Sequence, residues 1–84
     1  MSHYVYILQS LRGSKYYIGE TTDVAARLLF HNNGKQRSTM HRIPFKLILF
    51  EKYETREPAL KRERQIKSYK GGRAFKELIA SVGM

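Results

Sequence analysis

The sequence contains no cysteine and no tryptophan, and only seven of its residues are acidic. Without cysteine, neither disulfides nor zinc bound by thiolates can stabilise the fold, so stability has to come from packing. No segment approaches the roughly 20 apolar residues that a membrane-spanning helix needs, and the first residues lack a secretory signal pattern. These absences predict a soluble cytoplasmic protein with no membrane partner.

Positive charge dominates the composition. Sixteen Lys and Arg against seven Asp and Glu give a net charge of +9 and an isoelectric point near 10.1. A field of this sign concentrates polyanions at the surface, so nucleic acid is the expected partner. The alternative is a charge that only confers solubility, but the basic residues are clustered along the chain, which favours the first interpretation.

Three short segments have the composition of β-strands. Residues 4–8 and 15–19 are rich in β-branched and aromatic residues, and residues 12–14 between them have turn chemistry, which predicts a hairpin. Residues 44–53 form a nearly continuous apolar run of strand length, which predicts the central strand of a sheet. Because 84 residues can bury only one core, a single domain spanning residues 1–84 is expected.

Three helices are expected as well. The first, from about Asp23 to Asn33, begins among N-cap residues and ends at an Asn-Gly stop. The second runs from about Thr55 to Tyr69 and is broken by two glycines. The third begins near Arg73, and its apolar residues at helical spacing are Phe75, Leu78, Ile79 and Val82.

The first predicted helix carries a candidate site. Asp23, Arg27 and His31 lie at successive i, i+4 positions, which predicts one polar line along the helix edge. A histidine in such a line is either a proton-transfer group or an ordinary solvent-exposed side chain.

Two basic stretches are expected to contact phosphates. Residues 34–42 carry no acid and few large apolar residues, so they should form an exposed loop. The second predicted helix is also strongly basic. The candidate contacts are Lys35, Arg37 and Arg42 in the loop and Arg62 and Lys67 in the helix.

Glu63 is the only carboxylate of the second predicted helix beyond its first turn. At 100° per residue it shares an arc with Ala59 and Ile66, which turns it toward the apolar side. A carboxylate near a core needs a partner, either an arginine or a metal ion. Because the chain has no cysteine and only three scattered histidines, Mg²⁺ or Mn²⁺ is expected rather than zinc.

Four of the six tyrosines, Tyr4, Tyr6, Tyr16 and Tyr17, lie in the predicted hairpin. Such a cluster is typical of cross-strand packing, although a phenol at a site can also relay a proton or hold a water molecule.

Taken together, these motifs resemble those of the GIY-YIG nuclease superfamily. Tyr-Val-Tyr at residues 4–6, followed after ten residues by Tyr-Ile-Gly at 17–19, is similar to the paired GIY and YIG elements. Arg27 lies where the family has its catalytic arginine, and residues 59–67 resemble the helix with the metal-binding glutamate, here Glu63. The match covers essentially the whole chain and is strongest for the small stand-alone bacterial members.

The resemblance implies an α+β fold in which a three-stranded antiparallel sheet is flanked by about three helices. Two tyrosines, an arginine and a glutamate should meet on one face. By this comparison Glu63 would bind Mg²⁺ (or Mn²⁺), and Arg27 would stabilise charge growing on the phosphate. Tyr6 and Tyr17 would position or deprotonate the attacking water, and His31 could share the proton transfer.

The leading hypothesis is a metal-dependent endonuclease that hydrolyses phosphodiester bonds in DNA rather than RNA. Its substrates would be branched, damaged or single-stranded and selected by shape. The alternative is a nucleic-acid-binding module of the same fold without catalysis, because Tyr4 replaces the first motif's glycine and Glu20 stands where several relatives carry lysine. A protein-interaction domain would differ by a weak salt dependence of any nucleic-acid binding. The default expectation is a monomer.

Overall fold

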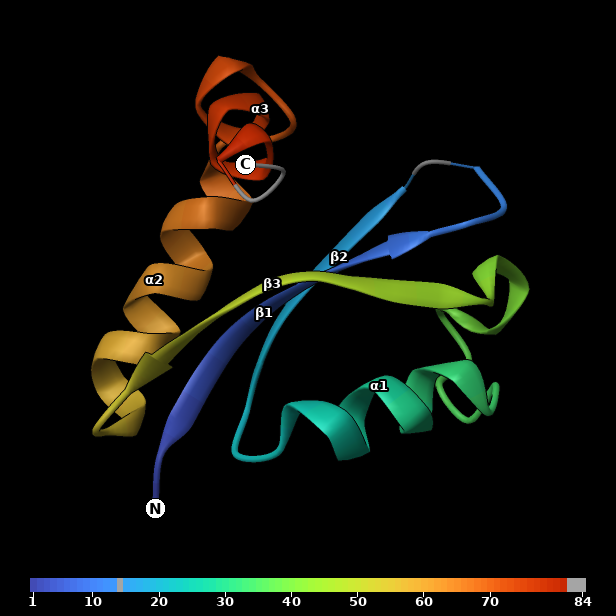
Figure 1. Ribbon diagram of the computed structural model, residues 1–84, viewed down its shortest axis with the longest axis horizontal. Coiled ribbons are helices and arrows are strands. Elements are labelled where there is room, and N and C mark those ends of the chain that lie inside the picture. The colour runs from blue at the N-terminus through green and yellow to red at the C-terminus, as the bar shows by residue number, and fades with distance from the viewer. Residues whose placement is uncertain (14, 82–84) are drawn as a thin grey trace.

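The computed structural model describes residues 1–13 and 15–81. The elements follow in the order β1 (His3–Ser10), β2 (Tyr16–Thr21), α1 (Val24–Asn32), β3 (Phe45–Tyr53), α2 (Arg56–Ser68) and α3 (Arg73–Ala80), with a short 3₁₀ helix at Met40–Arg42 (Figure 1). This confirms the expected α+β class. Ser14 of the predicted turn and Val82 of the predicted third helix lie outside the described residues.

The sheet is antiparallel in the order β2-β1-β3, so β1 is the central strand. The prediction that residues 44–53 form the central strand is therefore wrong. A register shift in the β1–β3 ladder explains the error: Ile7 pairs with Leu49 but Leu8 pairs with Leu47, which leaves Ile48 as an extra residue. The bulge allows the neighbours Ile48 and Leu49 to pack against the same cluster, so a continuous apolar run arises at an edge strand.

Each face of the sheet is covered by helix (Figure 1). On one face α1 packs on a cluster built around Tyr6, Leu8 and Phe45, to which it contributes Val24 and Leu28. Because side chains alternate along a strand, Val5 and Ile7, the neighbours of Tyr6 in β1, point to the other face.

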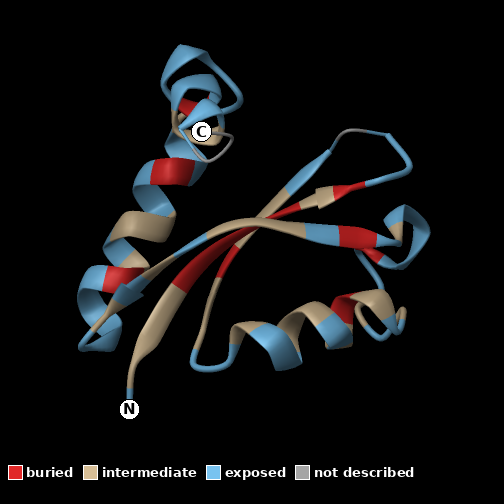
Figure 2. Ribbon diagram, viewed as in Figure 1, coloured by how far each residue is buried: buried red, intermediate tan, exposed pale blue. Residues whose placement is uncertain are grey.

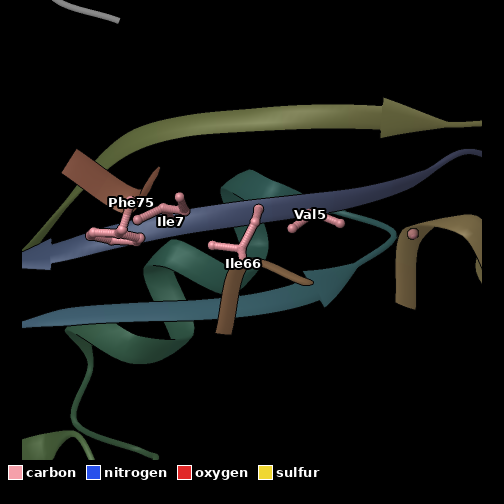
Figure 3. Packing of buried hydrophobic residues seen from close by; sticks show 5 residues of the cluster. Val5, Ile7, Ile66 and Phe75 are labelled. Atoms are coloured by element: carbon pink, nitrogen blue, oxygen red, sulfur yellow. The ribbon is translucent and has the colours of Figure 1, made fainter. Parts of the chain in front are cut away.

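On that second face, α2 and α3 contribute Ala59, Ile66 and Phe75 to a cluster with Val5 and Ile7 of β1. Figure 3 shows Ile66 and Phe75 against β1 beside these two strand residues. Figure 2 shows the middle of β1 as the most continuously buried segment, as expected for a central strand covered on both faces.

Local chemistry explains the helix ends. The Asp23 side chain accepts a hydrogen bond from the Ala26 amide at 3.0 Å and caps α1, and Gly34 follows its end with φ of +71°. α2 ends at Ser68, shortly before Gly71 with φ of +75°. These ends agree with the predictions from N-cap residues and glycine stops.

The end of α1 is tied to the start of β3. The side-chain oxygen of Asn32 accepts from the Phe45 amide at 2.6 Å, and its side-chain nitrogen donates to the Phe45 carbonyl at 3.1 Å. The Ser10 hydroxyl donates to the Arg42 carbonyl at 2.5 Å. These bonds hold the connecting loop against β1. In the described part of the chain, no helix is both long and apolar enough to cross a membrane.

Candidate active site

The two hairpin tyrosines meet the end of α1 on the face of the sheet that this helix covers. The rings of Tyr6 and Tyr17 stack with their centroids 6.4 Å apart. The imidazole of His31 lies 4.6 Å from the Tyr17 ring and 6.4 Å from the Tyr6 ring. Strands β1 and β2 thus supply the tyrosines, and α1 supplies the histidine that packs on both.

Gly19 makes the position of Tyr6 possible. The two residues are direct partners in the β1–β2 ladder, and Tyr6 is only 2% exposed. A β-carbon on Gly19 would lie 2.6 Å from Cζ of Tyr6, closer than packed carbon atoms can approach. The glycine of the second motif therefore leaves the space in which the Tyr6 phenol lies over β2.

His31 is 1% exposed and has a partner on each ring nitrogen. Its Nε2 lies 3.4 Å from the Tyr6 hydroxyl and its Nδ1 3.2 Å from the Thr39 hydroxyl. Because Thr39 donates its own hydrogen to the Gln36 carbonyl, it accepts from Nδ1–H of His31. The Nε2 lone pair then faces the Tyr6 O–H. Thr39 is a site residue that the sequence did not indicate, since nothing local links it to His31.

Along the predicted line of Asp23, Arg27 and His31, burial increases toward the end of α1. Asp23 is exposed, Arg27 is half-buried and His31 is buried. At 100° per residue, each step of four residues turns the side-chain direction by about 40°. The two steps from Asp23 to His31 therefore turn it by about 80°, which moves His31 from the helix edge to the side that faces the sheet. His31 is therefore not the solvent-exposed helix residue that one interpretation expected.

Burial sets the protonation of this group. It raises the pKa of the Tyr6 hydroxyl well above 10.0, and the nearby Tyr17 adds to the rise. Arg27 opposes the rise, whereas Glu63 and Glu20 contribute to it. Burial, helped by Arg27, lowers the pKa of His31 below 6.5. Tyr6 and His31 are therefore both neutral at pH 7, and Tyr17, which is half-buried, is the more accessible of the two tyrosines.

Arg27 borders an open hollow of about 210 Å³ along α1, together with Thr21, Asp23 and Phe30. Its guanidinium carbon lies 5.3 Å from the centroid of the Phe30 ring, which holds the side chain along the helix. Within residues 1–13 and 15–81, no carboxylate lies within ion-pair distance of Arg27. The guanidinium is thus available to an anion.

Glu63 reaches this region from α2, the helix on the opposite face. The tyrosines and Arg27 come from the sheet and from α1, whereas Glu63 comes from the helix on the other face of the sheet. Its charge still contributes to the raised pKa of Tyr6, so it is within electrostatic range of that hydroxyl. The Glu63 side chain is 16% exposed and pairs with Lys67 at 2.8 Å, not with an arginine.

Glu20 is a second carboxylate close to the tyrosines. It follows the second motif directly, and its side chain is only 11% exposed. His3 Nδ1 lies 2.9 Å from its carboxylate, and Arg56 Nε lies 3.8 Å away. Glu20 is paired with Val5 in the ladder and so faces the α2 side of the sheet. His3 lies two residues before Val5 and so faces the same side of the sheet as Glu20. The hairpin register could therefore have predicted the contact between His3 and Glu20.

The predicted phosphate contacts divide into two groups. Lys35, Arg37 and Arg42 lie exposed in the loop before β3. Arg62 is instead held by Glu51 through bonds of 2.8 and 3.1 Å, and it also donates to Gln65. Arg62 therefore joins α2 to β3, and its role as a nucleic-acid contact stays a prediction.

The carboxylates suit a cation that is only partly bound by protein. The described residues contain no cluster of three or more His, Asp or Glu side chains that could enclose a metal ion. Glu63 is a single carboxylate whose partner Lys67 is itself more than half exposed and free to move away. Mg²⁺ commonly binds through one or two carboxylates and keeps water and phosphate oxygens as its other ligands, so Glu63 fits this ion.

Residues 2–75 match the GIY-YIG catalytic domain family. The chain belongs to this family, which places it in a nuclease superfamily and confirms the resemblance of its motifs. A UPF0213 protein of Haloquadratum walsbyi is 44% identical over 82 residues, 96% of this chain and 89% of the relative. A UPF0213 protein of Staphylococcus epidermidis is 47% identical over 68 residues, 80% of this chain and 82% of the relative.

The fold is also found in a solved relative. The solution NMR structure of a UPF0213 protein from Bacillus halodurans matches this chain with a TM-score of 0.56 and 36% identity. The match covers 98% of this chain and 85% of the relative. The three-stranded sheet and its flanking helices are thus shared with that protein.

Proposed function

We propose that the protein is a metal-dependent endonuclease that hydrolyses phosphodiester bonds in DNA, with branched, damaged or single-stranded substrates selected by shape. The observation that carries the proposal is the packing of the tyrosines of the two family motifs with each other and with His31. The Tyr6 and Tyr17 ring centroids lie 6.4 Å apart, and the His31 ring lies 4.6 Å from that of Tyr17. A net charge of +9 supports a polyanionic substrate.

Arg27 is the proposed phosphate ligand. It has no acidic partner within ion-pair distance among the described residues, and it borders an open hollow along α1. In the transition state of hydrolysis, negative charge grows on the phosphate oxygens, and a guanidinium held by Phe30 would stabilise it without reorganising. Its two parallel N–H groups suit a phosphate geometrically.

Tyr17 is the proposed contact with the attacking water. Its ring is half-buried, whereas Tyr6 and His31 are almost fully enclosed. The Thr39–His31–Tyr6 chain of hydrogen bonds holds the surface on which the Tyr17 ring packs. Tyr6 and His31 are therefore proposed as positioning residues, because both are almost fully enclosed and His31 is bonded to Tyr6 and to Thr39.

Glu63 is the proposed ligand of Mg²⁺ or Mn²⁺. Such an ion, when bound, polarises a phosphate oxygen and promotes ionisation of a bound water. In the structure Lys67 neutralises Glu63, so an ion and this lysine compete for the same carboxylate. Binding of nucleic acid would favour the metal ion over Lys67 at the Glu63 carboxylate. A phosphate oxygen would serve as a further metal ligand, and the phosphate would also give Lys67 a new partner.

The test is cleavage of labelled single-stranded, duplex, flapped and branched DNA, with matching RNAs, in Mg²⁺, Mn²⁺ or EDTA. Glu63→Gln keeps the shape of the side chain and removes its charge, and it should lower the metal-dependent rate by at least about 10²-fold. Glu77→Gln is the matched control, because Glu77 is 67% exposed and pairs with Arg73 in the same i, i+4 manner. Equal cutting by both variants would exclude Glu63 as the metal ligand.

A binding module without catalysis is the second candidate. It is favoured by the Lys67–Glu63 ion pair, which supplies Glu63 with a structural partner. Tight, salt-dependent binding across the panel with no cleavage under any metal condition would support the module and refute the endonuclease.

A further inference from the structure

A groove lies away from Arg27, between the first residues of β2 and the junction of α2 with α3. It has a volume of about 360 Å³, with Tyr16, Ile18 and Phe75 on its apolar part and Lys15, Lys67 and Lys70 around them. A second hollow of about 300 Å³ shares Tyr16 and Phe75 and adds Lys76. The two form one trough along the edge strand β2.

The trough combines an aromatic face with lysines. Tyr16 is 38% exposed, and its ring meets the edge of Phe75 at a centroid distance of 4.9 Å. Phe75 is itself buried, so it holds the exposed tyrosine ring in place. Among residues 1–13 and 15–81, four lysines and no carboxylate line the trough. A fixed ring beside several ammonium groups is complementary to a flat base with phosphates on either side.

The side chains of the trough favour an unpaired strand. In a duplex the faces of the bases are already stacked on one another, so they cannot stack on Tyr16. Apart from the Tyr16 hydroxyl, the polar side chains that line the trough in the described residues are flexible lysines, which attract phosphates as point charges and do not fix a base edge or a ribose. Binding should therefore depend on unpaired bases and charge, and not on sequence or sugar.

Lys67 connects the trough with the proposed active site. Lys67 lines the trough, and its ammonium lies 2.8 Å from the carboxylate of Glu63. A strand that follows the lysines along β2 is thus led to the proposed metal ligand. A phosphate there would compete with Glu63 for Lys67.

We propose that this trough binds a single-stranded nucleic-acid segment, with one base stacked on Tyr16 and the adjacent phosphates on Lys15, Lys67 and Lys70. The proposal rests on the proposed function in one respect, since it identifies the unpaired part of the endonuclease substrate. It also distinguishes the roles of the two basic regions, because the loop before β3 lies on the other side of the sheet from the trough.

The test is binding of labelled oligonucleotides, measured by fluorescence anisotropy in EDTA with the Glu63→Gln protein, so that no cleavage interferes. Tyr16→Leu keeps apolar packing on Phe75 but removes the flat ring, and it should weaken binding of an oligothymidylate about tenfold. Tyr16→Phe should bind within about twofold of the parent. Binding of a blunt duplex, or of a strand of the same length without bases, should not change with either variant.

The lysines are tested by salt dependence. Lys70→Ala and Lys15→Ala should each reduce the slope of log Kd against log salt by about 0.7 for a single strand, whereas Lys52→Ala on β3 should leave it unchanged. Oligothymidylate and oligouridylate should bind within about threefold of each other, because stacking on Tyr16 and attraction to the lysines do not depend on the sugar.

Several outcomes would overturn the proposal. Unchanged single-strand binding by a folded Tyr16→Leu protein would do so, as would equal weakening of duplex binding or a strong preference for RNA. If the trough instead joined two copies of the chain, Tyr16→Leu would shift the elution volume of the free protein. Failure of the endonuclease proposal leaves these binding results intact, and failure of the trough leaves Glu63-dependent cleavage intact.

Discussion

Gly19 faces Tyr6 across the β1–β2 ladder, and the Tyr6 phenol occupies the space that any side chain at position 19 would need. The two family motifs are therefore one structural unit: the glycine of the second makes room for the tyrosine of the first. This relationship couples the packing of the hairpin to the geometry of the candidate active site.

Gly19→Ala is expected to destabilise the protein and to displace Tyr6. The new methyl group would overlap the phenol ring, and overpacking of this kind costs about 1–3 kcal/mol. Cleavage activity should fall along with stability, because the Tyr6–His31 contact moves. Gly13→Ala in the same hairpin is the control, since a β-carbon there meets nothing within 4 Å. Urea unfolding curves for the two variants provide the measurement, and equal midpoints would refute the coupling.

His31 should make stability depend on pH near neutrality. Burial lowers its pKa in the folded protein below the ordinary value of 6.5, so the unfolded chain binds the proton more readily. This contribution is fully present above pH 6.5 and is lost as the pH falls through the lower, folded pKa. His31→Gln should flatten the unfolding free energy between about pH 7 and 5, whereas His41→Gln, in the exposed loop, should keep the wild-type slope. Parallel curves for wild type and His31→Gln would contradict this.

The Glu51–Arg62 pair should govern the acid side of the stability profile. Hydrogen bonds from Arg62 hold the pKa of the Glu51 carboxyl below 4.5, against the effect of burial, and the Tyr53 hydroxyl assists. A lowered folded pKa gives stability that is present above pH 4.5 and lost as the pH falls through the folded value. Arg62→Met should cost about 1–3 kcal/mol at pH 7 and reduce the loss below pH 4.5.

The matched control is Arg73→Met. Arg73 is 93% exposed in its pair with Glu77, so its loss should change stability by less than about 0.5 kcal/mol. Arg62→Met should also leave single-strand binding within about twofold, because its guanidinium is occupied by Glu51. A large loss of binding in a folded Arg62→Met protein would show that this residue contacts phosphate.

Asn32 should be a stability determinant. Its amide satisfies both backbone groups of Phe45, and removing it leaves a donor and an acceptor unpaired where α1 meets β3. Asn32→Ala should cost about 1–3 kcal/mol in thermal or urea unfolding, whereas Asn33→Ala at the exposed helix end should cost less than about 1 kcal/mol. Equal stability of the two variants would show that water replaces the Asn32 bonds.

Features that depend on near neighbours were predicted well from the sequence. The hairpin, the ends of α1 and α2 and the inward turn of Glu63 each follow from turn residues, caps or helical spacing over a few positions. The partial burial of Glu63 agrees with its arc beside Ala59 and Ile66, both fully buried. Such signals are local because they arise from backbone geometry and from side chains within one or two turns.

Features that depend on distant parts of the chain were not predicted. The bulge at Ile48 allowed an edge strand to look like a central one, and only its pairing with β1 distinguishes the two. Arg62 looked like a free cation until β3 placed Glu51 beside it. Thr39 became a partner of His31 only because the loop folds back under α1.

The sequence by itself determined the family, the order of the elements and the residue types available for phosphate chemistry, because motif spacing and local propensity are written along the chain. Tertiary structure alone decided which of those residues are enclosed and which reach solvent. It enclosed Tyr6 and His31, left Tyr17 and Arg27 accessible, and brought Glu63 in from the opposite face. The physical reason is that burial and charge pairing depend on packing between layers, which no window of neighbouring residues contains.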